Sequence, residues 1–261
     1  MTEIKYLSYT KIRCYLECPR LFLYRYLKKL PAILNGRMLA GRCYHHGVEY
    51  ALKRKMAGSL TSVDEVKDIM SDRWEVELGE HVVYETEDEP KVEARHVDWG
   101  DDEPGKLKDT VLKLGGLYVK TMVPTLEPIA VEKKLSAEIA GIPFLGYADV
   151  ILPGPGVIDH KFATRRATVE AINKDLQFSA YAALLQGPIW CSWHQALNQK
   201  KPDINVVSTT RNQGDIDWFT HLVASVYPGI ISGIYPPNPL TWQCGENRCS
   251  YWLECKILME N

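Results

Sequence analysis

The sequence lacks the long apolar runs of a membrane protein. Across its 261 residues no stretch reaches the roughly 20 consecutive apolar residues that span a bilayer. The best candidate, residues 222–235, contains Pro228 and two glycines. The first ten residues, MTEIKYLSYT, lack the apolar segment of a secretory signal. We therefore expect no membrane partner and a cytoplasmic location, which for a virus-encoded chain is the host cytoplasm.

The sequence also lacks an excess of charge of either sign. Lys and Arg number 31 against 33 Asp and Glu, a formal net charge of −2, so composition alone does not indicate a nucleic-acid partner. The charge is unevenly distributed, however. Residues 85–103 hold nine acidic and two basic side chains. That segment contributes −7 and leaves the rest of the chain at +5, so one acidic segment masks a positive remainder.

Internal repeats, low-complexity tracts and the glycine-rich phosphate loop of helicases are absent as well. Any unwinding of a nucleic acid would therefore need a separate protein. The apolar fraction of 46% and the charged fraction of 25% are those of a folded globular chain, which excludes a wholly disordered or fibrous protein. A chain of this length can bury roughly three quarters of its unfolded surface, so we expect one domain over residues 1–261.

The cysteines do not suit a disulfide framework. Seven is an odd number, and a cytosolic chain keeps its thiols reduced. Metal binding, catalysis or simple burial remain as explanations. Three of the seven, Cys244, Cys249 and Cys255, lie in a tail from Pro236 onward that is rich in proline, tryptophan and cysteine. We expect this tail to be irregular.

The first 125 residues are expected to be mainly helical. Ser8 is a suitable N-cap for the first helix, which Pro31 follows, and Gly58 ends the second. The acidic, turn-rich stretch 85–105 is expected to be a loop or a mobile insertion. The helices are expected over residues 8–29, 37–57, 61–80 and 106–122.

From Ile129 the apolar pattern changes to the alternation of β-strands. Gly141 and the run Pro153-Gly154-Pro155-Gly156 separate three successive strands, which predicts a β-meander. Helices followed by a mostly antiparallel sheet with helices interspersed indicate a mixed α/β (α+β) fold. The strands are expected over residues 129–140, 143–152, 157–163, 189–197 and 204–209, and the remaining helices over residues 168–186 and 215–232.

Two carboxylates and a lysine come together in the predicted hairpin. Asp149 lies on one strand, and Asp159 and Lys161 lie on the next. Carboxylates hold Mg²⁺ or Mn²⁺, and an ammonium group can polarise or position an attacking water. An isolated pattern of this kind is more often a solvated hairpin with its charges in water, so it needs support from geometry and from other motifs.

Strand alternation tests whether the three side chains share a face. It places Asp159 and Lys161 on one face and His160 on the other. Asp149 lies on the same face as Asp159 and Lys161 if the residue numbers of each directly paired position in the hairpin sum to an even number. Asp149 opposite Lys161, with a five-residue loop over residues 153–157, is an example, whereas a four-residue loop would point Asp149 away.

The hairpin resembles motifs II and III of the PD-(D/E)xK nuclease superfamily. Two helical motifs resemble its RecB-like and AddB-like exonuclease branch. One is Gly41-Arg42-Cys43-Tyr44-His45, followed by Glu49, which resembles the motif G-x-x-x-H. The other is Gln177 and Tyr181, which resemble the motif Q-x-x-x-Y and lie four residues apart, on one helical face.

The two ends of the chain resemble the members of that branch, CRISPR-associated or helicase-linked, that carry an iron–sulfur cluster. The N-terminal resemblance is the pair Cys18-Pro19, and the C-terminal one is Cys244-x4-Cys249-x5-Cys255. The matches follow the family's order over nearly the whole chain. They imply a restriction-endonuclease-like core, with a central mixed sheet flanked by helices. Its parts would be a helical region over residues 1–125, a catalytic sheet core over 126–210, and a tail over 236–261 joined to Cys18.

The resemblance also implies a site for one or two Mg²⁺ or Mn²⁺ ions, beside which Lys161 positions a water. Adjacent residues on a helix point about 100° apart, so only one of His45 and His46 is expected to reach the metal. The resemblance selects His45, and His46 remains the alternative. The implied ligands are the side chains of His45, Asp149 and Asp159 and the backbone carbonyl of His160.

A 4Fe–4S cluster is implied at the cysteines, as a clasp between the chain's two ends. Four thiolates with one remote ligand suit such a cluster, whereas structural zinc sites show tighter C-x2–4-C pairs. Zinc, or four unrelated buried thiols, are the alternatives. Cys14, one turn before Cys18, is the alternative fourth ligand, and Cys43 and Cys191 are expected in the core. The implied ligands are Cys18, Cys244, Cys249 and Cys255.

The implied substrate is DNA, with basic side chains contacting its phosphates. Arg165 and Arg166 follow the catalytic strand, and in the family Gln177 and Tyr181 contact DNA or order the helix beside Lys161. We therefore expect a metal-dependent exonuclease acting on single-stranded DNA ends in recombination, repair or CRISPR-type processing. A helicase, a recombinase or a CRISPR integrase is the candidate protein partner. The alternatives are a non-catalytic or weakly catalytic DNA-binding or assembly subunit of a recombination or CRISPR adaptation complex, and a zinc-stabilised RNA-processing factor.

Overall fold

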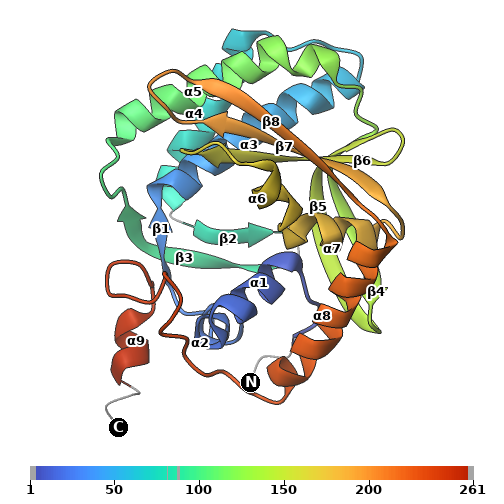
Figure 1. The fold of residues 1–261 in the computed structure, drawn as a ribbon. Coiled ribbons are helices and arrows are strands. Elements are labelled where there is room, and N and C mark those ends of the chain that lie inside the picture. Colours follow the sequence, from blue (N-terminus) through green and yellow to red (C-terminus); the bar gives the residue numbers. More distant parts are fainter. Residues whose placement is uncertain (1–3, 81, 87–88, 258–261) are drawn as a thin grey trace.

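A five-stranded mixed sheet forms the centre of the protein (Figure 1). The computed structural model describes residues 4–80, 82–86 and 89–257. Neighbouring strands in the sheet are antiparallel except for β6 and β7, which are parallel. This confirms the expected mixed α/β, restriction-endonuclease-like fold. In sheet order the strands are β4 (Ala130–Ile139), β5 (Ile142–Leu152), β6 (Gly156–Ala163), β7 (Ile189–Leu197) and β8 (Asp203–Arg211).

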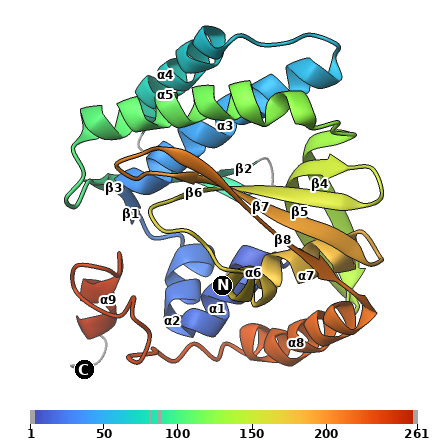
Figure 2. The same cartoon turned by 45° about the horizontal axis from the view of Figure 1, so that its top comes forward.

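Helices cover both faces of this sheet (Figures 1 and 2). On one face lie α3 (Gly36–Met56) and α5 (Pro104–Thr121), with α4 (Val63–Glu80) packed against both. On the other face lie α7 (Leu176–Leu184) and α8 (Gln213–Ile231), with α1 (Tyr9–Glu17) packed against both. None of the helices in the described residues is long and apolar enough to cross a membrane.

The first helix is shorter than expected because it breaks at a cysteine. Ser8 caps α1 as predicted, its hydroxyl accepting from the backbone N–H of Lys11 at 3.3 Å. Cys18 is extended, with φ −159° and ψ 106°. Proline disfavours helical geometry in the residue before it and is well suited to start a helix. The chain therefore restarts at Pro19, as α2 (Pro19–Phe22) and a π-helical turn (Leu23–Leu27).

The prediction that residues 85–105 form a loop is wrong. Strand β2 (Val82–Thr86) pairs antiparallel with β3 (Glu89–Asp98), and β3 pairs in parallel with β1 (Ala32–Asn35). Residues 87 and 88 of the segment lie outside the described residues. The high acidic content suggested a loop, whereas β3 pairs on one side with the adjacent β2 and on the other with β1, more than 50 residues away in the sequence, and local composition does not reveal the distant partner.

The predicted helix 168–186 is two helices. Thr168 caps α6 (Val169–Asn173) and Asp175 caps α7, the Asp175 side chain accepting from the backbone N–H of Gln177 at 2.6 Å. The buried Arg211 donates to the carbonyls of residues 172, 173 and 175. The carbonyl of residue 172 also accepts the backbone N–H of Asp175 at 3.2 Å, so the guanidinium adds to the bonds that the chain makes at this helix end. A guanidinium from β8 therefore stabilises the break.

The C-terminal tail packs against the N-terminal helices, as both views show (Figures 1 and 2). Asn238 donates to the carbonyl of Glu17 at 2.8 Å, and Tyr251 donates to that of Leu30 at 3.1 Å. The tail is irregular as expected, apart from the short helix α9 (Trp252–Ile257). Residues more than 200 positions apart are therefore neighbours.

Candidate active site

A cavity opens between α3, α7 and the strands β4, β5 and β6. One face of α3 supplies residues at helical spacing (Arg42, His45 and Glu49). The strands supply acidic and basic side chains, which a strand does not need in order to pack in the sheet. The lining includes Asp149, Asp159, His160, Lys161, Gln177 and Tyr181, which are all residues singled out from the sequence.

The β5–β6 hairpin brings the two aspartates to matching positions. Val150 pairs with Ile158 and Leu152 with Gly156, so paired numbers sum to an even value and the predicted parity is confirmed. The example register was off by two residues, because the loop contains three residues, 153–155, instead of five. Gly154 has φ +83°, a conformation that glycine adopts without strain, and this permits the tighter turn.

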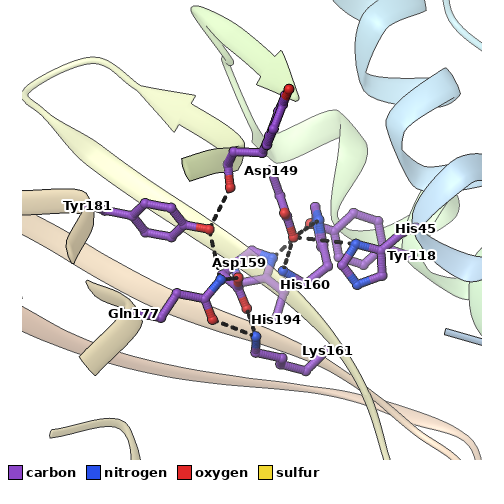
Figure 3. Close-up of polar contacts among 10 residues, drawn as sticks. His45, Tyr118, Asp149, Asp159, His160, Lys161, Gln177, Tyr181 and His194 are labelled. Atoms are coloured by element: carbon purple, nitrogen blue, oxygen red, sulfur yellow. Dashed lines mark hydrogen bonds and ion pairs between the residues drawn. The ribbon is translucent and has the colours of Figure 1, made fainter. Parts of the chain in front are cut away.

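The buried Asp159 and the half-buried Lys161 form an ion pair that α7 completes (Figure 3). Lys161 Nζ lies 2.6 Å from Asp159 Oδ2 and donates to Gln177 Oε1 at 2.9 Å. Gln177 Nε2 in turn donates to Asp159 Oδ1 at 2.7 Å and to the Tyr181 hydroxyl at 2.8 Å. Tyr181 donates to the backbone carbonyl of Tyr147 at 2.6 Å. Gln177 and Tyr181 therefore hold the lysine in place.

Burial and pairing set the charges of this ion pair. Burial raises the pKa of Asp159 to about 7, against the opposing effect of the Lys161 ammonium. Burial alone would lower the pKa of Lys161, but Asp159 beside it raises that pKa above the ordinary value. The lysine is therefore a cation at neutral pH, held next to a carboxylate that is costly to ionise without a positive partner.

Asp149 lies among groups from α3 and β6. Its Oδ2 accepts the backbone N–H of His160 at 2.7 Å and lies 3.5 Å from Nδ1 of His45 and 3.5 Å from Nδ1 of His160. Burial tends to raise the pKa of Asp149, but the two histidines outweigh it and lower that pKa to about 2. His46 lines the same cavity but lies outside this group.

The group formed by His45, Asp149 and His160 fits a divalent cation. One ligand atom from each residue lies within 4.8 Å of the other two. The ring of His45 also bonds the backbone of His160, and the role of the His160 carbonyl as a ligand stays a prediction. Burial lowers the pKa of His45, which favours the neutral imidazole that binds metals. Nitrogen and oxygen donors in this mixture suit Mn²⁺ and related ions.

A family profile of the PD-(D/E)XK nuclease superfamily matches residues 6–256. The chain belongs to this superfamily. The match supports a nuclease, and the fold agrees with it.

One solved structure similar to this nuclease fold is a putative exonuclease from Eubacterium rectale. It has a TM-score of 0.57 and 12% identity over 90% of this chain and 85% of that chain, a likeness that shows the fold. The structure of SSO0001 has a TM-score of 0.42 and 13% identity over 98% of this chain and 87% of that chain, which is too low to carry an argument. No curated protein matches the sequence.

Sequence reasoning missed Glu132 in this nuclease site. Glu132 lines the cavity from β4 and has φ +50°. Burial, together with the nearby Asp149 and Glu49, raises its pKa to about 8. The sequence did place a glutamate 17 positions before Asp149, in the strand expected to pair with the strand of Asp149. Its position opposite Asp149 follows only from the β4–β5 register.

Two arginines that line the nuclease cavity, Arg42 and Arg73, are paired with one buried glutamate. Glu77, which is 3% exposed, accepts from Arg42 at 3.0 Å and from Arg73 at 2.9 Å. Both arginines line the cavity. Arg165 and Arg166, the predicted DNA contacts, are not among the described lining residues. Arg166 instead bonds Asp203 and Asn205 of β8.

The four cysteines expected to bind a cluster line one small cavity between α2 and the tail. Cys14, the alternative to Cys18, is 3% exposed, and burial raises its pKa to about 12. Cys43 and Cys191 are buried, as expected. Within the described residues no three cysteine sulfurs lie within 4.8 Å of one another. The residues lining the cavity are Cys18, Cys244, Cys249 and Cys255, among others.

Proposed function

We propose that this PD-(D/E)XK protein is a metal-dependent deoxyribonuclease that removes nucleotides from the ends of single-stranded DNA. The observation that carries the proposal is the convergence of Asp149 with the Asp159–Lys161 ion pair at one cavity that also holds His45. These are the residues that the superfamily's hairpin and helical motifs predict. We propose, from the family resemblance, that this activity serves recombination, repair or CRISPR-type DNA processing.

The residues that would hold one or two Mg²⁺ or Mn²⁺ ions are His45, Asp149 and Asp159, with the carbonyl of His160. When bound, a divalent cation lowers the pKa of water and neutralises charge on the scissile phosphate. Lys161, held by Asp159 and Gln177, presents a fixed positive charge that orients the attacking water and stabilises the developing negative charge. The nucleophile is water, so no serine or cysteine nucleophile is needed.

Arg42 and Arg73 supply the phosphate contacts next to this centre. Both are held by the buried Glu77, so their guanidinium groups are ordered before a strand binds. Two arginines against one glutamate leave a net positive charge, which attracts a phosphate backbone. Arg165 and Arg166 follow the catalytic strand β6 in the sequence. They are proposed as phosphate contacts further along the substrate.

The iron–sulfur clasp is proposed on the chemistry of the cysteines. Four thiols from both ends of the chain face one cavity, and a 4Fe–4S cluster takes four thiolates. Within the described residues no three of these sulfurs lie within 4.8 Å of one another, so the proposal rests on the number of thiols and on the family resemblance. This assignment also motivates the RecB-like and AddB-like branch.

A nuclease assay on end-labelled single strands with Mn²⁺ tests the proposal. Lys161→Ala should abolish cleavage and retain DNA binding. Lys174→Ala, which removes an exposed lysine paired with Glu170, is the matched control and should cleave normally. Full activity in both variants would contradict the assignment. A wild-type protein that binds DNA but never cleaves it would support the alternative, a DNA-binding or assembly subunit. The candidate partners (a helicase, a recombinase or a CRISPR integrase) can be added to either assay.

A further inference from the structure

We propose that the imidazole of His160 is itself a metal ligand, which adds a second histidine to the proposed ligand set of His45, Asp149 and Asp159. The inference rests on the proposed metal-dependent function and deepens it. The family resemblance implied only the backbone carbonyl of His160. The structure adds the side chain, because Nδ1 of His160 lies 3.5 Å from Oδ2 of Asp149.

The first argument is the spacing of the three ligand atoms. Nδ1 of His45 and Nδ1 of His160 each lie 3.5 Å from Oδ2 of Asp149. That is longer than a normal N–H···O hydrogen bond. Metal bonds of about 2.1 Å place ligand atoms about 3.0 Å apart in an octahedron and about 3.4 Å apart in a tetrahedron. The observed spacing therefore fits a cation between the groups after a small adjustment.

The two rings are also oriented so that both can bind one ion. Their centroids lie 5.8 Å apart and their planes are at 89°. Perpendicular rings at this distance neither stack nor collide, and each directs its Nδ1 toward Asp149 (Figure 3). His45 comes from α3 and His160 from β6, so two packed elements fix the angle between them.

The second argument is the buried support behind His160. The hydroxyl of Tyr118, on α5, lies 2.8 Å from Nε2 of His160 and 2.8 Å from Nδ1 of His194, on β7. His160 and His194 are each 3% exposed and Tyr118 is fully buried. A histidine that binds a metal through one nitrogen characteristically bonds a partner through the other. Tyr118 is that partner for His160.

Tyr118 can serve both rings in two proton arrangements, and metal binding through Nδ1 of His160 requires one of them. Tyr118 has one hydroxyl proton and two ring-nitrogen partners, so it donates to one ring and accepts from the other. If Tyr118 donates to His194, it accepts from Nε2–H of His160. A neutral His160 then presents the lone pair of Nδ1 toward Asp149. Two electron-rich atoms facing each other are unfavourable unless a cation lies between them, so metal binding selects this arrangement.

This ligand set has a consequence for which metal binds. Imidazole nitrogen binds first-row transition ions well, whereas Mg²⁺ prefers an all-oxygen shell with several waters. A centre with two imidazoles should therefore bind Mn²⁺ at least about tenfold more tightly than Mg²⁺. A centre with one imidazole and three oxygen ligands would show a smaller difference between its affinities for Mn²⁺ and Mg²⁺.

The test measures Mn²⁺ binding to the full chain without nucleic acid. Electron spin-echo spectroscopy of the bound Mn²⁺ detects the nitrogens of coordinated imidazoles. We expect two in the wild type and one in His160→Val, with a Kd for Mn²⁺ weakened about 10–100-fold. His46→Ala, which removes the neighbouring histidine outside the group, should leave the spectrum unchanged. Tyr118→Phe should keep both nitrogens and weaken the Kd about tenfold.

Several results would overturn the inference. These are a single imidazole in the wild type, a spectrum that ignores His160→Val, a Kd for Mn²⁺ no tighter than that for Mg²⁺, or an absence of Mn²⁺ binding. If His160→Val fails to fold, Tyr118→Phe decides, and an unchanged Kd there overturns the proposal. A chain that binds Mn²⁺ through two imidazoles but leaves DNA intact would support this inference and contradict the proposed function. Cleavage by a centre with one imidazole would do the reverse.

Discussion

Glu132 lies opposite Asp149 across the β4–β5 pair. The residues on either side of Glu132 pair in continuous register with those beside Asp149, so two carboxylates face each other. Glu132 has φ +50°, a conformation that costs free energy in any residue other than glycine. The pKa of Glu132 is raised to about 8 and that of Asp149 is lowered to about 2. The two carboxyl groups together hold one proton near neutral pH. The strained backbone of Glu132 lies at the cavity.

Replacing Glu132 with glutamine should stabilise the metal-free protein at high pH. A carboxyl whose pKa is raised by folding loses stability as pH rises from its ordinary value of 4.5 to about 8. Each pKa unit is worth about 1.4 kcal/mol, and solvent screening reduces the expected gain of Glu132→Gln to about 1–3 kcal/mol at pH 9. Below pH 4.5 both proteins should be equally stable.

Thermal unfolding in EDTA between pH 4 and pH 9 measures this difference. Glu138→Gln, an exposed change on the same strand, is the control and should show no pH-dependent gain. A difference between Glu132→Gln and wild type that stays constant with pH would show that Glu132 does not titrate as its surroundings indicate.

Removing the amide of Gln177 should slow the chemical step. Gln177 bonds both members of the Asp159–Lys161 pair, so Gln177→Ala leaves the lysine less well positioned. We expect kcat to fall about 10–100-fold, the range of a lost positioning contact, with KM changed little. Steady-state kinetics on single-stranded DNA measure both constants. Gln213→Ala on α8 is the control, and a rise in KM at constant kcat would indicate a binding role instead.

Removing one arginine of the cationic cluster should weaken DNA binding and its salt dependence. In a Lys161→Ala background, which prevents cleavage, Arg73→Gln should raise the Kd for an oligonucleotide several-fold. It should also reduce the slope of log K against log salt by about 1. Arg42 still pairs with Glu77 in this variant, so no buried charge is left alone. Fluorescence anisotropy over a salt series measures the effect.

Arg54→Gln is the matched control for that measurement, since Arg54 is an exposed arginine of α3 that is not among the cavity-lining residues. An equal loss of affinity in both variants would place the binding surface outside the cavity. No loss in Arg73→Gln would remove Arg73 from the substrate path.

Replacing Cys18 should remove the cluster and loosen the tail. Cys18→Ser protein purified without oxygen should be colourless, whereas the wild type should be brown and contain about four iron atoms per chain, as a 4Fe–4S cluster requires. Cys14→Ala should keep the colour, because Cys14 lies in the core rather than in the cysteine-lined cavity. Limited proteolysis after Pro236 should become faster in Cys18→Ser. Zinc in a colourless wild-type sample would contradict the cluster.

Local patterns in the sequence were enough for the fold class and for most elements. The periods of apolar residues, the cap at Ser8 and the glycines of the hairpins determine the helices and strands of the main sheet. The motif residues Asp149, Asp159, Lys161 and His45 were named from their order along the chain together with the family resemblance. The breaks at Cys18 and Asp175 were missed, although Pro19 indicated the first.

What the sequence by itself determined is therefore the set of elements and which chemical groups each one carries. Only the tertiary structure decided which of those groups meet. The pairing of β1 with β3, the position of Glu132 opposite Asp149 and the Tyr118–His160–His194 chain all join segments far apart in sequence. Such contacts depend on strand register and helix packing over the whole core. A different register would give a side chain different neighbours while the local sequence around it stayed the same.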